Sequence, residues 1–272
     1  MGNAQRASQG RELGAAGHSV GTDPKASYVY TDDKLGPAEP VRVETSAAVF
    51  QPTSTTRLLL RALRRHALAT DRSALDLGCG CGIVAVVLRR FVLPTGRIGA
   101  SDLSQAAVEL ARRNSERLGA NLDVRCGSLF EPWKGLRFDL IVDDVSAVAE
   151  PIARSSSWYP PQVPSEAGDD GTRWITKVLE QAPEFLEPGG RLFFPVLTLA
   201  DEVKTLAVAS ARYASVTQLD EEWYPLGPDL APRLDLLQEL ADRGVVRLRR
   251  RGSRWLWATK VYVASDPLPA PA

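Results

Sequence analysis

The stretch that decides the fold is Asp76-Leu77-Gly78-Cys79-Gly80-Cys81-Gly82, in which glycines alternate with cysteines directly after an apolar segment. Glycines at alternate positions allow the backbone to turn sharply and to approach a ligand closely. Residues 83–91 have the pattern of a buried helix, and a helix N-terminus favours a negatively charged group. The pattern therefore predicts a ligand-binding turn between a strand and a helix.

Strand and helix patterns alternate on both sides of this turn. A helix at 105–118, for example, carries an apolar stripe at helical spacing. Repeated strand–helix units form a parallel sheet covered on both faces. We therefore predict an α/β, Rossmann-like fold with a mostly parallel, seven-stranded sheet and helices on both faces. The strands are expected at 73–77, 97–102, 122–126, 138–142, 191–196, 215–223 and 255–264.

We expect one main domain, at residues 71–265, with additions at both ends. Residues 1–26 lack apolar periodicity, which favours a disordered tail. Residues 143–171 are expected to be irregular, and loops of that length inside a compact domain are usually functional. The remaining segments are an N-terminal extension of short strands and a helix at 27–70, a cap insertion at 223–250 and a second tail at 266–272.

The overall charge is balanced, with 33 Lys and Arg against 33 Asp and Glu. A neutral chain is not drawn to nucleic acid or to an anionic membrane, so we expect neither partner. Five arginines between Arg247 and Arg254 could contact phosphates, but a solvated hairpin is the favoured interpretation. No apolar run could span a bilayer and no signal pattern is present, so a soluble cytoplasmic protein is expected. No pattern indicates an oligomeric state.

Three cysteines, Cys79, Cys81 and Cys126, are too few for a disulfide framework and fit a reducing compartment. The spacing of Cys79 and Cys81, with only two histidines elsewhere in the chain, does not suit zinc. We therefore expect no metal site.

Two classes of cofactor use a glycine-rich turn of this kind. A dinucleotide fingerprint needs a third glycine at its sixth position, which here is Ile83. Asp76 lies two places before the first glycine, and Asp102 ends the next predicted strand. A carboxylate at that position can accept hydrogen bonds from both ribose hydroxyls.

The turn resembles motif I of the class I methyltransferases. Residues 50–196 resemble the release-factor glutamine methyltransferase family and its amino-methyltransferase relatives, through the segments 50–56, 101–107, 127–132, 168–171 and 186–190. The resemblance implies S-adenosyl-L-methionine as cofactor, with Thr56 near its methionine end. The expected cofactor-binding residues are Thr56, Asp76, Gly78, Gly80, Gly82, Asp102, Leu103, Ser128, Leu129 and Asp143.

Two motifs of the family are changed in this chain. The family ends its fourth strand with Asn-Pro-Pro-Tyr, which holds a planar amide or amine nitrogen, and here the sequence is Asp144-Val145-Ser146-Ala147. Ser128 replaces an adenine-side Asp. We therefore expect a methyltransferase acting on nitrogen or oxygen of a small molecule. The alternatives are a protein or RNA N-methyltransferase, and a cofactor-binding subunit without catalysis.

Asp143 and Asp144 are the candidate catalytic residues, because ligands of open α/β sheets bind outside the carboxyl ends of the strands. Asp144 could orient an amine or take a proton from the acceptor. It could also simply cap the following turn. In the long loop, Ser146, Trp158 and Tyr159 are the candidate substrate-binding residues. The two aromatic residues could instead pack the loop onto the core.

Overall fold

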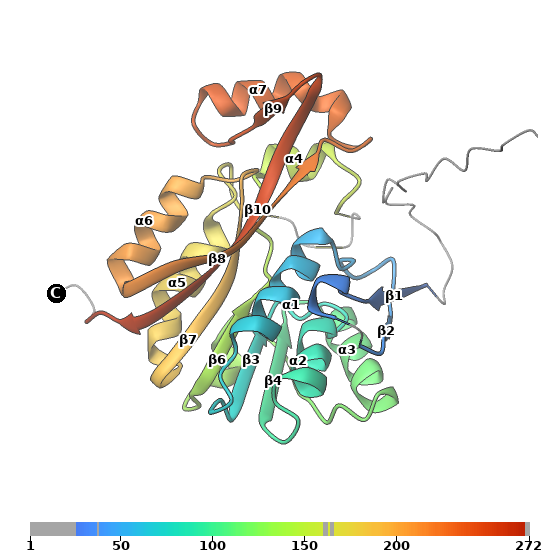
Figure 1. Ribbon diagram of the computed structural model, residues 1–272, viewed down its shortest axis with the longest axis vertical. Helices are drawn as coiled ribbons and strands as arrows, with labels where there is room; N and C mark the ends of the chain where they lie inside the picture. Colours follow the sequence, from blue (N-terminus) through green and yellow to red (C-terminus); the bar gives the residue numbers. More distant parts are fainter. Residues whose placement is uncertain (1–25, 37, 160–162, 164–165, 270–272) are drawn as a thin grey trace, which may run out of the picture.

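The computed structural model describes residues 26–36, 38–159, 163 and 166–269, so the predicted tail at 1–26 lies almost entirely outside the described residues. Its main sheet has the strand order β5-β4-β3-β6-β7-β10-β8 (Figure 1). Strands β3 to β7 run parallel to one another, and β10 is antiparallel to both of its neighbours. The strands are β3 (Ser73–Leu77), β4 (Arg97–Asp102), β5 (Asp123–Cys126), β6 (Phe138–Asp143), β7 (Leu186–Leu197), β8 (Tyr213–Pro225) and β10 (Arg254–Pro267).

This architecture confirms the predicted α/β, Rossmann-like class, with one additional strand. The eighth strand, β9 (Arg249–Arg251), pairs with the start of β10 across a tight turn at Gly252. Strand β10 continues to Pro267, so it enters the segment that was predicted to be a tail.

Both faces of the sheet are covered by helices, as the nearly continuous apolar character of its central strands requires. Helices α1 (Ser54–His66), α2 (Ile83–Phe91) and α3 (Gln105–Arg117) lie on one face, and α5 (Arg173–Gln181) and α6 (Glu202–Arg212) on the other (Figure 1). Successive strand residues point to opposite faces. In β3, Ala74 packs with the first group of helices, whereas Leu75 and Leu77 pack with the second.

An N-terminal hairpin supports the glycine-rich turn from outside. It consists of β1 (Ser27–Tyr30), the short 3-10 helix η1 (Asp33–Leu35) and β2 (Val41–Glu44). The buried Asn114 of α3 accepts a hydrogen bond from the Glu44 amide at 2.8 Å and donates one to the Cys81 carbonyl at 2.9 Å. One amide side chain therefore holds the hairpin against the turn.

Arg61 of α1 joins the same hairpin to the sheet through a buried ion pair. Its guanidinium donates to Asp32 at 2.7 Å, and these two side chains are only 4% and 1% exposed. It also donates to Glu222 of β8 at 3.2 Å. We expect Arg61→Ala to lower the free energy of unfolding by about 3–5 kcal/mol, because the Asp32 carboxylate would stay buried without its partner. Urea unfolding measures this change.

Arg57 provides the control for that measurement, since it is exposed on the same helix. Arg57→Ala should change the free energy of unfolding by no more than about 0.5 kcal/mol. Equal effects of the two substitutions would contradict a special role for the buried pair.

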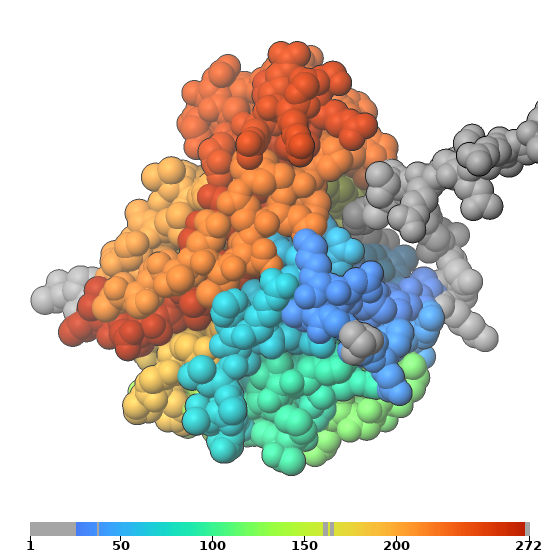
Figure 2. All heavy atoms as spheres, in the orientation of Figure 1, coloured from blue at the N-terminus to red at the C-terminus, as the bar shows by residue number. Residues whose placement is uncertain are grey.

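A third apolar cluster lies above the carboxyl ends of the parallel strands. It joins α4 (Glu150–Ser155), α7 (Leu234–Asp242), Trp257 of β10 and Leu230, which precedes the short 3-10 helix η4 (Ala231–Arg233). In Figure 2 the orange and red C-terminal residues form a protruding upper part of the molecule. The stretch 143–171, predicted to be irregular, thus contains a short helix. Two further 3-10 turns, η2 (Glu131–Trp133) and η3 (Ala182–Glu184), complete the elements.

Candidate active site

A cavity opens at the carboxyl ends of β3, β4 and β6, and the glycine-rich turn forms part of its wall. Gly78 and Gly80 have φ of +73° and +51°, a region that favours glycine. A β-carbon on Gly78 would lie 3.1 Å from the Cα of Val145 and 3.2 Å from the Asp144 carbonyl oxygen. The absence of a side chain at Gly78 therefore lets the segment after β6 pass close to the turn.

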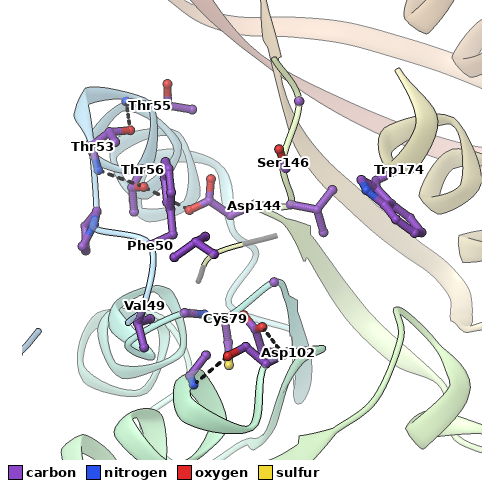
Figure 3. A pocket seen from close by; sticks show the side chains of 18 of the residues that line it. Val49, Phe50, Thr53, Thr55, Thr56, Cys79, Asp102, Asp144, Ser146 and Trp174 are labelled. Carbon is purple, nitrogen blue, oxygen red and sulfur yellow. Dashed lines mark hydrogen bonds between the residues drawn. The ribbon is translucent and has the colours of Figure 1, made fainter. Parts of the chain in front are cut away.

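Asp102 holds the turn from the end of β4. One carboxylate oxygen, Oδ2, accepts a hydrogen bond from the Gly80 amide at 2.9 Å, and the other, Oδ1, accepts one from the Ser104 amide at 2.8 Å (Figure 3). Burial raises the pKa of Asp102, and these backbone donors counteract the rise. The carboxylate is thus fixed in the cavity wall with lone pairs left for a ligand.

Most of the predicted cofactor-binding residues line this part of the cavity, which we call the cofactor side. Leu103, whose side chain is 56% exposed, lies beside Asp102. The cofactor side consists of Gly78, Cys79, Gly80, Asp102, Leu103, Ser128 and Leu129. The two cysteines of the turn are buried, and burial raises the pKa of Cys81 to about 12, so this thiol stays protonated at neutral pH.

Asp76 and Gly82, also predicted to bind the cofactor, lie outside the cavity lining. Asp76 is fully buried between β3 and α2, where its Oδ2 accepts a hydrogen bond from the Ala85 amide at 3.2 Å. Burial raises its pKa well above the usual range. Asp76 therefore fixes the start of α2. Gly82 lets α2 approach α3, since a β-carbon there would lie 3.1 Å from that of Ala111.

On the opposite wall, a hydrogen-bonded chain leads from the start of α1 to Asp144. The Thr53 amide donates to the Thr56 hydroxyl at 3.3 Å, and that hydroxyl donates to Asp144 Oδ2 at 3.0 Å (Figure 3). The first bond is half of a capping box, which fixes the Thr56 side chain. Because its oxygen accepts from Thr53, the hydroxyl points its proton at Asp144. Burial raises the pKa of Asp144 to about 7, and the Thr56 hydrogen bond opposes the rise.

Aromatic side chains line the same cavity as Asp144. The ring of Phe50 lies 4.9 Å from that of Tyr159, and Trp158 lies 5.6 Å from Trp257. The Ser146 hydroxyl donates to the Tyr159 hydroxyl at 3.2 Å. We call this region the acceptor side; its members are Phe50, Thr56, Asp144, Ser146, Trp158, Tyr159 and Trp257. The three predicted substrate-binding residues, Ser146, Trp158 and Tyr159, are all among them. The two aromatic residues also pack the loop onto an apolar cluster, as the alternative interpretation predicts.

Among the lining residues that the sequence did not identify are Phe50, Glu166, Trp174 and Trp257. Phe50 begins the segment that resembles the family, which could have identified it. Trp257 lies on a strand whose alternation was recognised, and only the sheet order brings it to the cavity. No sequence pattern distinguishes Glu166 or Trp174 from other loop and helix residues.

Asp143, predicted to be catalytic and to bind the cofactor, lies beside the cavity without lining it. As the last residue of β6 it is 1% exposed, and its Oδ1 accepts a hydrogen bond from the Val145 amide at 3.2 Å. Burial, and then the charge of Asp144, raise the pKa of Asp143 to about 8. Asp143 therefore stabilises the backbone turn at Asp144 and Val145, next to the cavity.

This raised pKa predicts how stability depends on pH. Between pH of about 4, the unfolded pKa, and about 8, the folded protein holds a proton on Asp143 that the unfolded chain has lost. Stability from this group therefore falls as pH rises through that window. Asp143→Asn can keep the bond from Val145 and has no charge to bury. We expect the melting temperature of Asp143→Asn to exceed that of the wild type, and the difference to grow as the pH rises to about 8. Each kcal/mol of difference in the free energy of unfolding corresponds to about 2–4 °C.

Thermal melts of both proteins across this pH range test the expectation. Asp123→Asn is the control, because Asp123 is exposed and paired with Arg125. A constant difference between wild type and Asp143→Asn at all pH values would contradict the assigned cause.

In the described part of the chain, no group of three or more His, Cys, Asp or Glu side chains is placed to hold a metal ion. None of its helices is long and apolar enough to cross a membrane.

Comparisons with known proteins relate the chain and its fold to the methyltransferases. The family model of the methyltransferase small domain matches residues 41–144. The fold is that of the solved T. thermophilus 16S rRNA N2 G1207 methyltransferase, which was determined with AdoMet and guanosine. That likeness has a TM-score of 0.53 at 16% identity and covers 89% of this chain and 51% of that one. Fold and turn together are those of the Rossmann-like, class I methyltransferases.

Within that class, the chain is related to the release factor glutamine methyltransferases. It is 36% identical to that of Geobacter sulfurreducens over 156 residues, 55% of this chain and 53% of that protein. It is 35% identical to the ribosomal protein uL3 glutamine methyltransferase of Xylella fastidiosa over 129 residues, 46% of this chain and 41% of that protein. The chain spans about half the length of the curated relatives it matches. These findings confirm the predicted relationship.

The expectation of a small-molecule acceptor is wrong in the light of these relatives, because they are named for protein substrates, a release factor and a ribosomal protein. The expectation was based on the missing Asn-Pro-Pro-Tyr motif. That motif contacts only the accepting chemical group, so its loss does not indicate whether the group belongs to a small molecule or to a protein.

The cofactor side fits S-adenosylmethionine, the cofactor that the relationship implies. The Asp102 carboxylate has lone pairs for ribose hydroxyls, and Leu103 and Leu129 offer apolar surface for a planar base. No Lys, Arg or His is among the described residues that line the cavity, which suits a cationic sulfonium. When bound, this cofactor supplies an electrophilic methyl group.

Proposed function

We propose that this protein is an S-adenosylmethionine-dependent methyltransferase whose acceptor is a nitrogen atom of a protein. The single observation that carries the proposal is one continuous cavity that joins the cofactor side to the acceptor side. Asp102 lies in one part and Asp144 in the other. The relatives, named for protein glutamine methylation, support a protein acceptor.

The residues of the acceptor side suit the insertion of a side chain. Phe50, Trp158 and Tyr159 give an apolar wall that excludes water from an inserted chain, and Asp144 is the charged group beyond it. Holding an acceptor nitrogen in line with the methyl group is the main requirement of such a transfer. The hydrogen bond from Thr56 fixes Asp144, so that it can orient the nitrogen.

Methyl-labelled S-adenosylmethionine tests the proposal. The purified protein is incubated with an extract of the source organism that has been freed of small molecules. Label should enter material that protease digests and ribonuclease does not. Asp102→Ala serves as the inactive control, since it removes the carboxylate of the cofactor side. Label that ribonuclease releases, or no label in any macromolecule, would overturn the proposal.

A further inference from the structure

The charges around the acceptor side are of one sign. Asp144 lies inside the cavity and Glu166 at its exposed rim, and no cationic side chain is among the described residues that line it. An inserted group therefore meets negative charge and aromatic rings.

The aromatic rings add attraction for a cation. Phe50, Tyr159, Trp158 and Trp257 come from three separate parts of the chain and line the same cavity as Asp144, with Phe50 next to Tyr159 and Trp158 next to Trp257. A cation over the face of an aromatic ring is attracted to it, and pockets lined with such rings recognise alkylated ammonium groups. An amide is neutral and gains no comparable attraction.

Asp144 has lone pairs available for such a group. Oδ2 accepts the hydrogen bond from Thr56, while Oδ1 accepts none from the described residues. The more open Oδ1 can accept an N–H of an ammonium, whereas a guanidinium pairs best with a carboxylate whose two oxygens are equally open to its parallel N–H groups. The family's Asn offers an amide oxygen at this place, which can hold an amide but cannot take up a proton.

We infer that the nitrogen acceptor is an alkylammonium group of the protein substrate, held by Asp144 and the aromatic residues of the acceptor side, and not an amide. This inference rests on the proposed function and names the chemical class of its acceptor. It separates this chain from the family it resembles at Asp144, where that family has Asn.

The reaction then balances as follows. The ammonium gives a proton to Asp144 Oδ1 and becomes a neutral amine. The lone pair of the amine nitrogen forms a bond to the methyl carbon as the carbon–sulfur bond breaks, and that electron pair stays on sulfur. The product is a methylated ammonium beside a neutral thioether, and Asp144 returns its proton to water. The pKa of Asp144, raised to about 7, suits this exchange near neutral pH.

Acid hydrolysis of the labelled protein distinguishes the acceptor classes. Hot acid cleaves an N-methyl amide to volatile methylamine, whereas a carbon–nitrogen bond of an amine survives. We expect nearly all of the label in an N-methylated amino acid: N-methyl-lysine for a side chain, or an α-N-methyl amino acid for a chain terminus. Asp144→Asn should lose this label while Asp169→Asn, an exposed carboxylate outside the cavity, keeps it.

Label recovered as volatile methylamine, or as methylarginine, would overturn the inference while leaving the proposed protein methylation intact. Failure of the proposed function is a different result, in which no label enters protein at all.

Discussion

Gly80→Arg is expected to abolish binding of S-adenosylhomocysteine, with affinity reduced about 100-fold or more. Gly80 lines the cofactor side, and a β-carbon there would meet no atom closer than the Phe50 carbonyl oxygen at 3.7 Å. The protein can therefore accommodate the β-carbon, while the rest of the side chain fills the cavity with a cation. Loss of about 2.8 kcal/mol of binding free energy already corresponds to 100-fold. Isothermal titration calorimetry measures the change.

The control must carry the same backbone strain without the obstruction. Gly80 has φ of +51°, where a side chain costs about 1–2 kcal/mol. Gly119 has φ of +61°, and a β-carbon there would have no atom within 4 Å. Gly119→Arg should therefore cost similar stability and leave the affinity unchanged. If a folded Gly80→Arg protein bound the ligand as the wild type does, the cofactor site would have to lie elsewhere.

The sequence predicted the strand–turn–helix framework correctly because local patterns determine it. Asp76 to Gly82 lies between an apolar strand and an apolar helix, and both elements form where the pattern places them. Helix α4 was missed, because its six residues are too few for a helical period to be recognised. Its proline near the first turn fits a helix start and was the one available signal.

The part of the candidate site that is built from the ends of neighbouring parallel strands was predictable from general rules of sheet topology. Asp102 and Asp144 lie at the same edge of the sheet, at the carboxyl ends of β4 and β6, for that reason. Of the adjacent pair Asp143 and Asp144, only Asp144 reaches the cavity. Trp257 reaches it from the far end of the chain, because β10 inserts between β7 and β8, and no local pattern contains that order.

Asp144→Asn is expected to slow methyl transfer by about 10²–10⁴-fold while leaving the affinity for S-adenosylhomocysteine unchanged. That factor is the usual contribution of a positioned acid or base. The substitution keeps the shape, and the new amide oxygen can still accept the hydrogen bond from Thr56. The cofactor side is built by Gly80 and Asp102, so its affinity should be insensitive to the change. Single-turnover transfer to the labelled protein fraction, with calorimetry alongside, measures both quantities.

The pH dependence separates a proton-accepting Asp144 from one that merely caps the turn. A base must be ionised to act, and burial raises the pKa of Asp144 to about 7. The wild-type rate should therefore rise with pH up to about 7 and level off above it, unless the acceptor's own titration adds a further rise at higher pH. Asp144→Asn should lose the step near 7, whereas Asp169→Asn should retain it. A turn cap would tolerate Asn almost silently, since both residues cap well. If Asp144→Asn transferred methyl at a rate within a few-fold of the wild type and with the same pH profile, Asp144 would not act as a base. The acceptor side would then contribute only by aligning the acceptor.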